Sequence, residues 1–243
     1  MSFSDPDWIA FRGRNRMLFN HPLETYLRGL ANRPFQRPDD RDRGYRANWE
    51  VRGDQTLWLT GLTTQPHDRR VDPGTQLGLR TPGPVSATWV SQCLRTPDTE
   101  QKRFSPIGNG TTYARESYLS VLRGRLVMVE EIDTRSNRRV GGELTPHLES
   151  VFGPEESAFL RSAVADPDDE APRLIYADWL DERHDPRAAV VRLAERLRHL
   201  DGESAADERL AGRGTIRRGQ DHWLWMRLLG YHHLATELAA VIE

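Results

Sequence analysis

The chain has 243 residues, of which 37% are hydrophobic and 29% are charged, and its formal net charge is −2. This length accommodates two domains, and the charge argues against a broad electrostatic attraction to nucleic acid or anionic membranes. The single cysteine, Cys93, excludes an internal disulfide and a zinc site built from several cysteines. Because no segment resembles a signal peptide or approaches the roughly 18 apolar residues of a membrane span, we expect a cytoplasmic protein without a membrane association.

The first half of the chain carries strand and turn signals. Apolar and polar residues alternate, as in strands with one buried face, and Gly, Asn and Asp stand between the alternating runs. One short segment instead opens with proline and repeats its apolar residues at helical spacing. The expected elements are a hairpin over 8–20, a helix over 21–30, a polar loop over 34–43, a hairpin over 44–62, a long polar loop over 63–84, and strands over 85–94, 117–122 and 125–132.

Three motifs in this half occur together. They are the helix Pro22–Leu27, the strand Gly44–Val51 with its sequence Gly-Tyr-Arg-Ala-Asn-Trp-Glu-Val, and the glycine-rich segment Gly108–Glu116. In this combination, residues 8–133 resemble a family of small bacterial proteins. The resemblance implies a fold unit and assigns no activity to it.

The second half changes its apolar period from two to about 3.6 residues. Residues 134–153 are polar and contain Gly-Gly and proline, so we interpret them as a linker. Beyond them, proline and acidic residues open helices in the way that helix starts require. The expected helices begin near Pro154, Ala171 and Arg187, the last continuing to Leu200, and two more are expected over 221–229 and 231–242. The helix from Ala171 is apolar on most sides, which predicts a position in the middle of a bundle.

Residues 165–188 carry the most specific pattern in the chain. The run Ala-Asp-Pro-Asp-Asp-Glu-Ala-Pro-Arg-Leu-Ile-Tyr-Ala-Asp-Trp-Leu-Asp-Glu-Arg-His-Asp-Pro-Arg-Ala resembles the repeat-companion domain of planctomycetes and myxobacteria. That resemblance implies a short helical unit with an accessory or adaptor role, and it assigns no enzymatic residue.

Asp178 is an acid within an otherwise apolar helix. One interpretation is a perturbed carboxylate in a functional site. The interpretation that we favour is a buried, helix-packing ion pair with an arginine, for which Arg187 is the first choice and Arg173 and Arg192 are alternatives.

The C-terminal segment is rich in aromatic residues. Trp223 and Trp225 belong either to the core or to an exposed patch that binds a partner. The nearby histidines do not have the spacing that metal ligands on a helix require, so neither a metal nor another cofactor is expected. These histidines are His222, His232 and His233.

Two alternatives compete with a role in protein binding. The arginine series from Arg33 to Arg46, which includes Arg37, Arg41 and Arg43, suggests binding to RNA or a phosphorylated ligand, but acidic residues dilute it and favour a solvated loop. The segment Gly108–Glu116 suggests a hydrolase or nucleotide-handling enzyme, although it lacks the Gly-Lys-Ser/Thr ending of a phosphate-binding loop. No catalytic arrangement follows from residue spacing.

The sequence therefore predicts an α+β protein: a mainly antiparallel β domain with one short helix over residues 1–133, a linker over 134–153 and an all-α bundle over 154–243. We expect a non-enzymatic adaptor or regulator of a bacterial cytoplasmic system that binds another protein. An inhibitor or immunity protein is a special case of this expectation.

Overall fold

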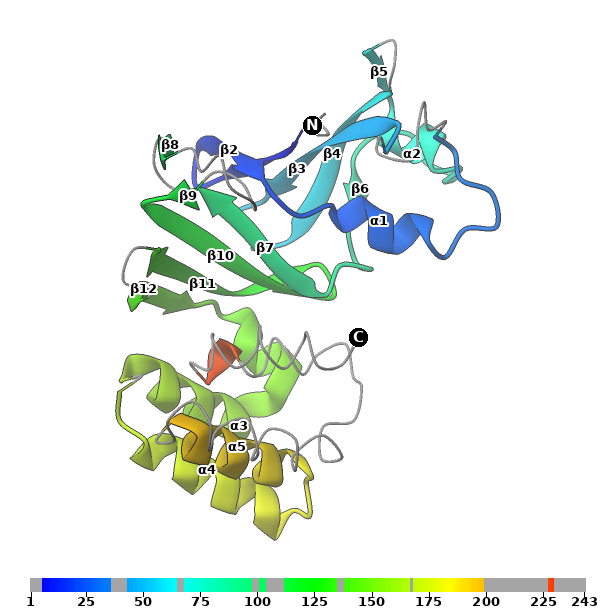
Figure 1. Ribbon diagram of the computed structural model, residues 1–243. Helices are drawn as coiled ribbons and strands as arrows, with labels where there is room; N and C mark the ends of the chain where they lie inside the picture. The colour runs from blue at the N-terminus through cyan, green and yellow to red at the C-terminus, as the bar shows by residue number, and fades with distance from the viewer. Residues whose placement is uncertain are drawn as a thin grey trace. The chain divides into compact units, whose positions relative to one another are not determined.

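The computed structural model describes residues 6–35, 43–64, 68–97, 101–103, 112–134, 138–166, 168–198 and 227–229. The chain is a mixed α+β protein that divides into two compact units, a first unit of residues 1–147 and a second unit of residues 148–243 (Figure 1). Among the described residues, no helix is both long and apolar enough to cross a membrane.

The first sheet of the first unit has the strand order β2-β1-β3-β4-β5, and a sixth strand, β6, also pairs with β4 (Figure 1). Strands β1 and β3 run parallel, and the other neighbours run antiparallel. A β-bulge interrupts the pairing of β3 with β4 after Asn48. The strands are β1 (Asp7–Phe11), β2 (Arg14–Leu18), β3 (Tyr45–Val51), β4 (Leu57–Thr64), β5 (Arg69–Val71) and β6 (Val85–Ser86).

The second sheet is antiparallel throughout and has the order β12-β11-β10-β7. Two further short strands, β8 and β9, pair only with each other among the described residues. The bounds are β7 (Gln92–Pro97), β8 (Gln101–Arg103), β9 (Thr112–Tyr113), β10 (Arg115–Leu122), β11 (Arg125–Asp133) and β12 (Arg138–Leu144).

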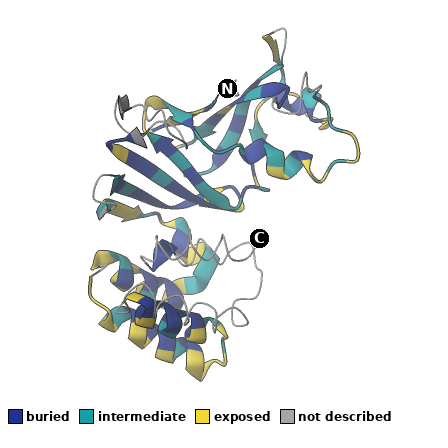
Figure 2. Ribbon diagram, viewed as in Figure 1, coloured by how far each residue is buried: buried dark blue, intermediate teal, exposed yellow. Residues whose placement is uncertain are grey.

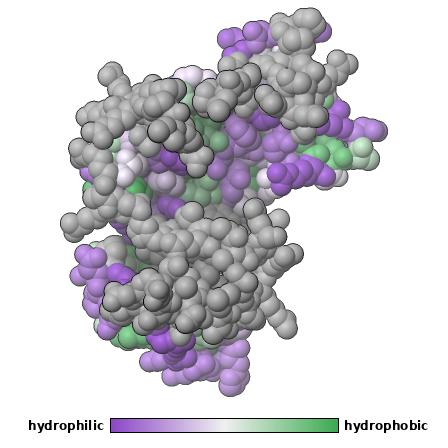
Figure 3. Space-filling model, viewed as in Figure 1, coloured by the Kyte–Doolittle hydropathy of each residue, from purple (hydrophilic) through white to green (hydrophobic). Residues whose placement is uncertain are grey.

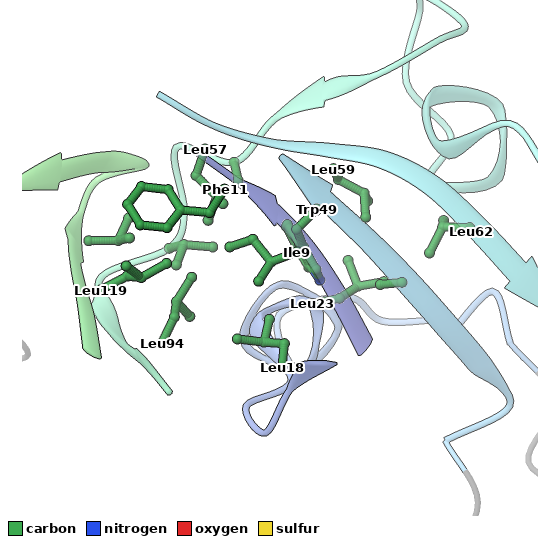
Figure 4. Packing of buried hydrophobic residues seen from close by; sticks show 14 of the residues in the cluster. Ile9, Phe11, Leu18, Leu23, Trp49, Leu57, Leu59, Leu62, Leu94 and Leu119 are labelled. Atoms are coloured by element: carbon green, nitrogen blue, oxygen red, sulfur yellow. The ribbon is translucent and has the colours of Figure 1, made fainter. Parts of the chain in front are cut away.

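The core of the first unit lies between the inner faces of these two sheets (Figure 4). Alternation along β1 places Ile9 and Phe11 on the inner face, where they meet Trp49 of β3. The second sheet contributes Leu94 and Leu119 to the same cluster. Because all five side chains are almost fully removed from water, each contributes roughly 1.5–3 kcal/mol of burial energy.

Two short helices complete the first unit. Helix α1 (Pro22–Leu27) begins with proline and buries Leu23 and Leu27 against the core. Helix α2 (Pro73–Gln76) begins after Asp72, whose side chain accepts a hydrogen bond from the backbone N–H of Thr75. In the view of Figure 3, the described surface of this unit is mostly hydrophilic.

The described part of the second unit is helical. It contains α4 (Ala171–Glu182), α5 (Arg187–Arg198) and nearly all of α3 (His147–Ala165), which is interrupted at Gly153, where φ is 77°. Helices α4 and α5 pack against each other, and each shows buried and exposed stretches in Figure 2. The all-helical bundle expected for the complete C-terminal half remains a prediction, because most residues after Arg198 lie outside the described set.

Several expected elements are confirmed and three are corrected. The hairpins β1–β2 and β3–β4, helix α1, strands β10 and β11, and helices α4 and α5 all occur where the sequence predicts them. The expected linker 134–153 is wrong, because its residues 138–144 form β12 and its last residues open α3. The loop expected over 63–84 contains β5 and α2, and the strand expected over 85–94 is divided into β6 and β7.

Candidate functional site

The end of the arginine series is anchored inside the first unit. The Arg43 side chain is buried, and its Nη1 donates a hydrogen bond to Oδ1 of Asp7 over 2.8 Å. Asp7 is fully buried (0% exposed) and also accepts hydrogen bonds from the backbone N–H of Ala47 and from Nε1 of Trp49. Arg43 is therefore a structural residue that stabilises a buried carboxylate rather than a side chain available to a partner.

The beginning of the same series is anchored by Glu24 of α1. Arg33 donates two hydrogen bonds to the two carboxylate oxygens of Glu24, and its Nη2 also donates to the backbone carbonyl of Arg43. Tyr45 Oη donates to Glu24 Oε1 over 2.9 Å. Burial raises the pKa of Tyr45 far above its usual value, and the negative charges of Asp7 and Glu24 raise it further.

These contacts weaken the RNA-binding hypothesis. Arg33 and Arg43 are paired with carboxylates, and Arg46 pairs with Asp68. Three of the arginines in the series are thereby neutralised within the chain. Arg37 and Arg41 lie outside the described residues.

The carboxylate of Glu116, at the end of the segment Gly108–Glu116, is also paired within the chain. Glu116 of β10 is buried, and Arg95 donates to both of its oxygens over 2.6 and 2.5 Å. Tyr118 Oη donates to the same carboxylate over 2.9 Å. The hydrogen bonds and charge of Glu116 outweigh the desolvation of Arg95 and raise the pKa of that guanidinium.

This geometry is typical of a structural ion pair rather than of a general base. Arg115, which precedes Glu116 in the segment of the enzyme hypothesis, is exposed, and alternation along the strand places it on the opposite face of the sheet from Glu116. The glycine turn at 108–111 lies outside the described residues. Cys93 is half-buried in β7.

The hypothesis of a buried pair between Asp178 and Arg187 is wrong. The Asp178 side chain is 72% exposed, and it accepts a hydrogen bond from Arg192, one of the alternative partners, over 2.8 Å. Arg192 also donates to Asp181. Helical periodicity explains the error, because Asp178 lies on the face of α4 opposite to Tyr176 and Leu180, which are buried.

Among the described helical residues, the ion pairs of the interior instead join Arg173 to Glu195 and Arg187 to Glu156. Arg187 donates to both carboxylate oxygens of Glu156 and also to Asp185, while Tyr176 Oη donates to Glu156 Oε1. Burial opposes the charge of Arg187, but hydrogen bonds to Asp185 and Glu156 outweigh it, so the pKa of the guanidinium is raised. This network ties α3 to the start of α5.

The C-terminal candidates fall outside the described set. This applies to Trp223 and Trp225 and to the three C-terminal histidines. Among the residues that the structure describes, no cluster of histidine, cysteine and carboxylate side chains has a geometry that holds a metal ion.

The outer face of the first sheet gives the strongest described candidate surface. Trp8, the outward-facing residue of β1, is 37% exposed, and Ala10 beside it is exposed as well. On the adjacent strands, Trp8 lies level with Asn48, and Ala10 lies level with Glu50 and Trp58. We call these five residues the Trp8–Trp58 face.

Trp58 is held in place by its neighbours. The guanidinium of Arg52 lies 3.8 Å from the centre of the indole ring, and Trp58 Nε1 donates to the hydroxyl of Thr56 over 2.7 Å. Thr56 in turn donates to Asp54. Arg52 also donates to Glu50, so the charges of this face are paired with each other.

Trp8 and Trp58 stand two strands apart and are offset by two residues along the strands. With strands spaced about 4.8 Å apart and residues about 3.4 Å apart, the two tryptophans lie at diagonally opposite corners of the Trp8–Trp58 face, about 12 Å from each other. The sequence shows both tryptophans, but it does not reveal that they share a face. That result depends on the parallel pairing of β1 with β3 and on the bulge after Asn48.

Comparisons of the chain with protein-family models, with curated proteins and with solved structures gave no match.

Proposed function

We propose that the chain is a non-enzymatic interaction protein of the adaptor or regulatory kind, which binds a protein partner in the bacterial cytoplasm through the Trp8–Trp58 face. The observation that carries this proposal is the exposed Trp8 on an outward sheet face that the described residues leave open. The resemblance of residues 165–188 to the repeat-companion domain supports an accessory role.

The chemistry of this face suits a protein partner. Tryptophan is enriched among the residues that dominate binding energy at protein interfaces. Because Arg52 and Thr56 already fix the Trp58 ring, little side-chain entropy is lost when a partner covers it. Small and polar residues between the two rings leave room for partner side chains to reach the sheet.

The same face is less suited to nucleic acid. Exposed aromatic residues on a sheet do stack on bases, but such platforms combine stacking with unpaired positive charge. Here Arg52 is paired with Glu50. We therefore expect binding that depends weakly on salt, whereas binding to phosphates weakens steeply as salt increases.

Photo-crosslinking tests this proposal. A photoreactive phenylalanine analogue is placed at the exposed Asn48 in the full chain, within cells of the native organism, and adducts are identified by mass spectrometry. The control carries the analogue at Thr25, an exposed residue of α1.

A discrete protein adduct from position 48, absent from position 25 and lost in Trp8→Ala, supports the proposal. Adducts with nucleic acid, or the same adducts from both positions, contradict it.

A further inference from the structure

The outer face of α4 leaves two adjacent aliphatic residues in water. Ile175 is 58% exposed and Leu174 is 36% exposed, whereas Tyr176, Ala177 and Leu180 are buried on the inner face. The sequence predicts this helix to lie in the middle of a bundle, so this exposure is a departure from that expectation.

Acidic residues bracket the aliphatic pair. Residues 168–182 contain six acids, all exposed, and a single arginine, Arg173, which is buried against Glu195. The acids are Asp168, Asp169 and Glu170 before the helix and Asp178, Asp181 and Glu182 along it. An apolar centre with a rim of one charge is typical of a protein-docking surface.

Two basic groups border this rim: Arg183, directly after Glu182, is paired with Glu155 of α3, and Arg192 serves two carboxylates of the rim. Arg192 of α5 donates to Asp178 over 2.8 Å and to Asp181 over 3.2 Å. One guanidinium shared by two exposed carboxylates leaves excess negative charge, and these hydrogen bonds raise the pKa of Arg192. The surface is therefore complementary to a partner that carries positive charge.

We propose that the outer face of α4 docks a basic amphipathic helix of a partner protein. An apolar side chain of this helix covers Leu174 and Ile175, and its lysine or arginine residues lie over the acids at either end. The distance along α4 from its first residue, Ala171, to Asp181 is about 15 Å, so the basic groups of the partner lie roughly three helical turns apart. This surface is separate from the Trp8–Trp58 face, and an adaptor needs two such surfaces.

Removal of Arg192 is expected to strengthen binding of a basic partner rather than to weaken it. A basic partner competes with Arg192 for Asp178 and Asp181, so removing this arginine frees both carboxylates for the partner. Exposed ion pairs of this kind contribute little to stability. We therefore expect Arg192→Ala to remain folded and to bind a basic peptide more tightly, by roughly two- to fivefold.

The probe is an 18-residue amphipathic peptide with leucine on one face and lysine and arginine on the other, titrated into the full chain by calorimetry. A peptide of the same pattern with glutamate at the basic positions is its control. We expect the basic peptide to bind, the acidic peptide not to bind, and Ile175→Ala to weaken binding about tenfold. Val140→Ala, at an exposed aliphatic residue of the first unit, leaves the affinity unchanged.

Three results overturn the proposal. The first is equal binding of the basic and the acidic peptide, and the second is weaker binding of the basic peptide by Arg192→Ala. The third is self-association of the chain that Ile175→Ala abolishes, because the outer face of α4 would then be an interface between copies. None of them affects crosslinking from Asn48, so failure here is distinguishable from failure of the Trp8–Trp58 face.

Discussion

The buried pair of Asp7 and Arg43 gives the sharpest stability prediction. Asp7→Asn keeps the shape of the side chain and removes its charge. The Arg43 guanidinium, itself almost fully buried, then faces an amide instead of a carboxylate. The amide oxygen keeps an acceptor for Arg43 and for the backbone N–H of Ala47, which both donate to Oδ1, whereas the amide NH2 stands where Oδ2 accepts from Nε1 of Trp49.

The magnitude follows from the burial of both partners. Breaking a buried ion pair by removing one charge costs about 3–5 kcal/mol, because the remaining charge is uncompensated. Asparagine retains one hydrogen-bond acceptor for Arg43, so we expect the lower end, about 3 kcal/mol. A protein of ordinary stability, about 5–15 kcal/mol, stays folded after this loss.

A double-mutant cycle measures the pair. The free energy of unfolding of the first unit is obtained from urea denaturation for Asp7→Asn, Arg43→Met and the double variant. We expect the losses of unfolding free energy in the two single variants to add up to about 2 kcal/mol or more beyond the loss in the double variant. The control is Glu143→Gln, which removes the partner of Arg12 in an exposed pair and costs less than about 1 kcal/mol. If Asp7→Asn costs no more than Glu143→Gln, the argument for a buried anchoring network is refuted.

Three further predictions concern the first unit. Gly124→Ala destabilises it by about 2 kcal/mol or more in urea denaturation, because φ is +75° and the added Cβ would lie 2.7 Å from a backbone carbonyl oxygen; an unchanged midpoint contradicts this. The hydrogen bond from the Thr75 backbone lowers the pKa of Asp72 in the folded chain. The Asp72 carboxylate therefore stabilises α2 fully above about pH 4, and this stabilisation is lost as the pH falls through the lowered pKa of the folded state. The protection of the Thr75 amide, measured as its hydrogen-exchange rate relative to the intrinsic rate at each pH, should fall over this range in the native chain, and protection at neutral pH no greater than in Asp72→Ala contradicts the cap. Tyr45→Phe removes the hydrogen bond to Glu24 and costs about 1 kcal/mol in the same denaturation assay, and no loss means that the bond contributes nothing.

Local patterns were enough to predict most regular elements. The alternation from Tyr45 to Val51 and the glycine turn at Gly53 predict the β3–β4 hairpin because both signals act within a few residues. The β12 strand was missed because Gly141 and Gly142 indicate a linker. Its pairing with β11, which no local signal reveals, overrides their low strand propensity.

The candidate sites depend on contacts between distant residues. Asp7 is the first residue of β1 and has the appearance of a solvated acid in the sequence, yet its partner Arg43 is 36 positions away. The sequence shows that Asp178 is an acid in a largely apolar helix, but it does not show which face of α4 this residue occupies. That face is decided by the side of α4 that α5 covers. The arginine series is basic in composition, and only the structure shows that Arg33, Arg43 and Arg46 are paired internally.

Affinity for the crosslinked partner tests the central claim most directly. The dissociation constant of that partner is measured for the native chain, for Trp8→Ala, and for Leu79→Ala, which alters a residue of similar exposure outside the Trp8–Trp58 face. We predict that Trp8→Ala weakens binding at least about thirtyfold, as expected for loss of roughly 2 kcal/mol at a dominant interface residue, and that Leu79→Ala has no effect. Equal affinities for all three proteins would contradict the assignment of the Trp8–Trp58 face as the binding surface.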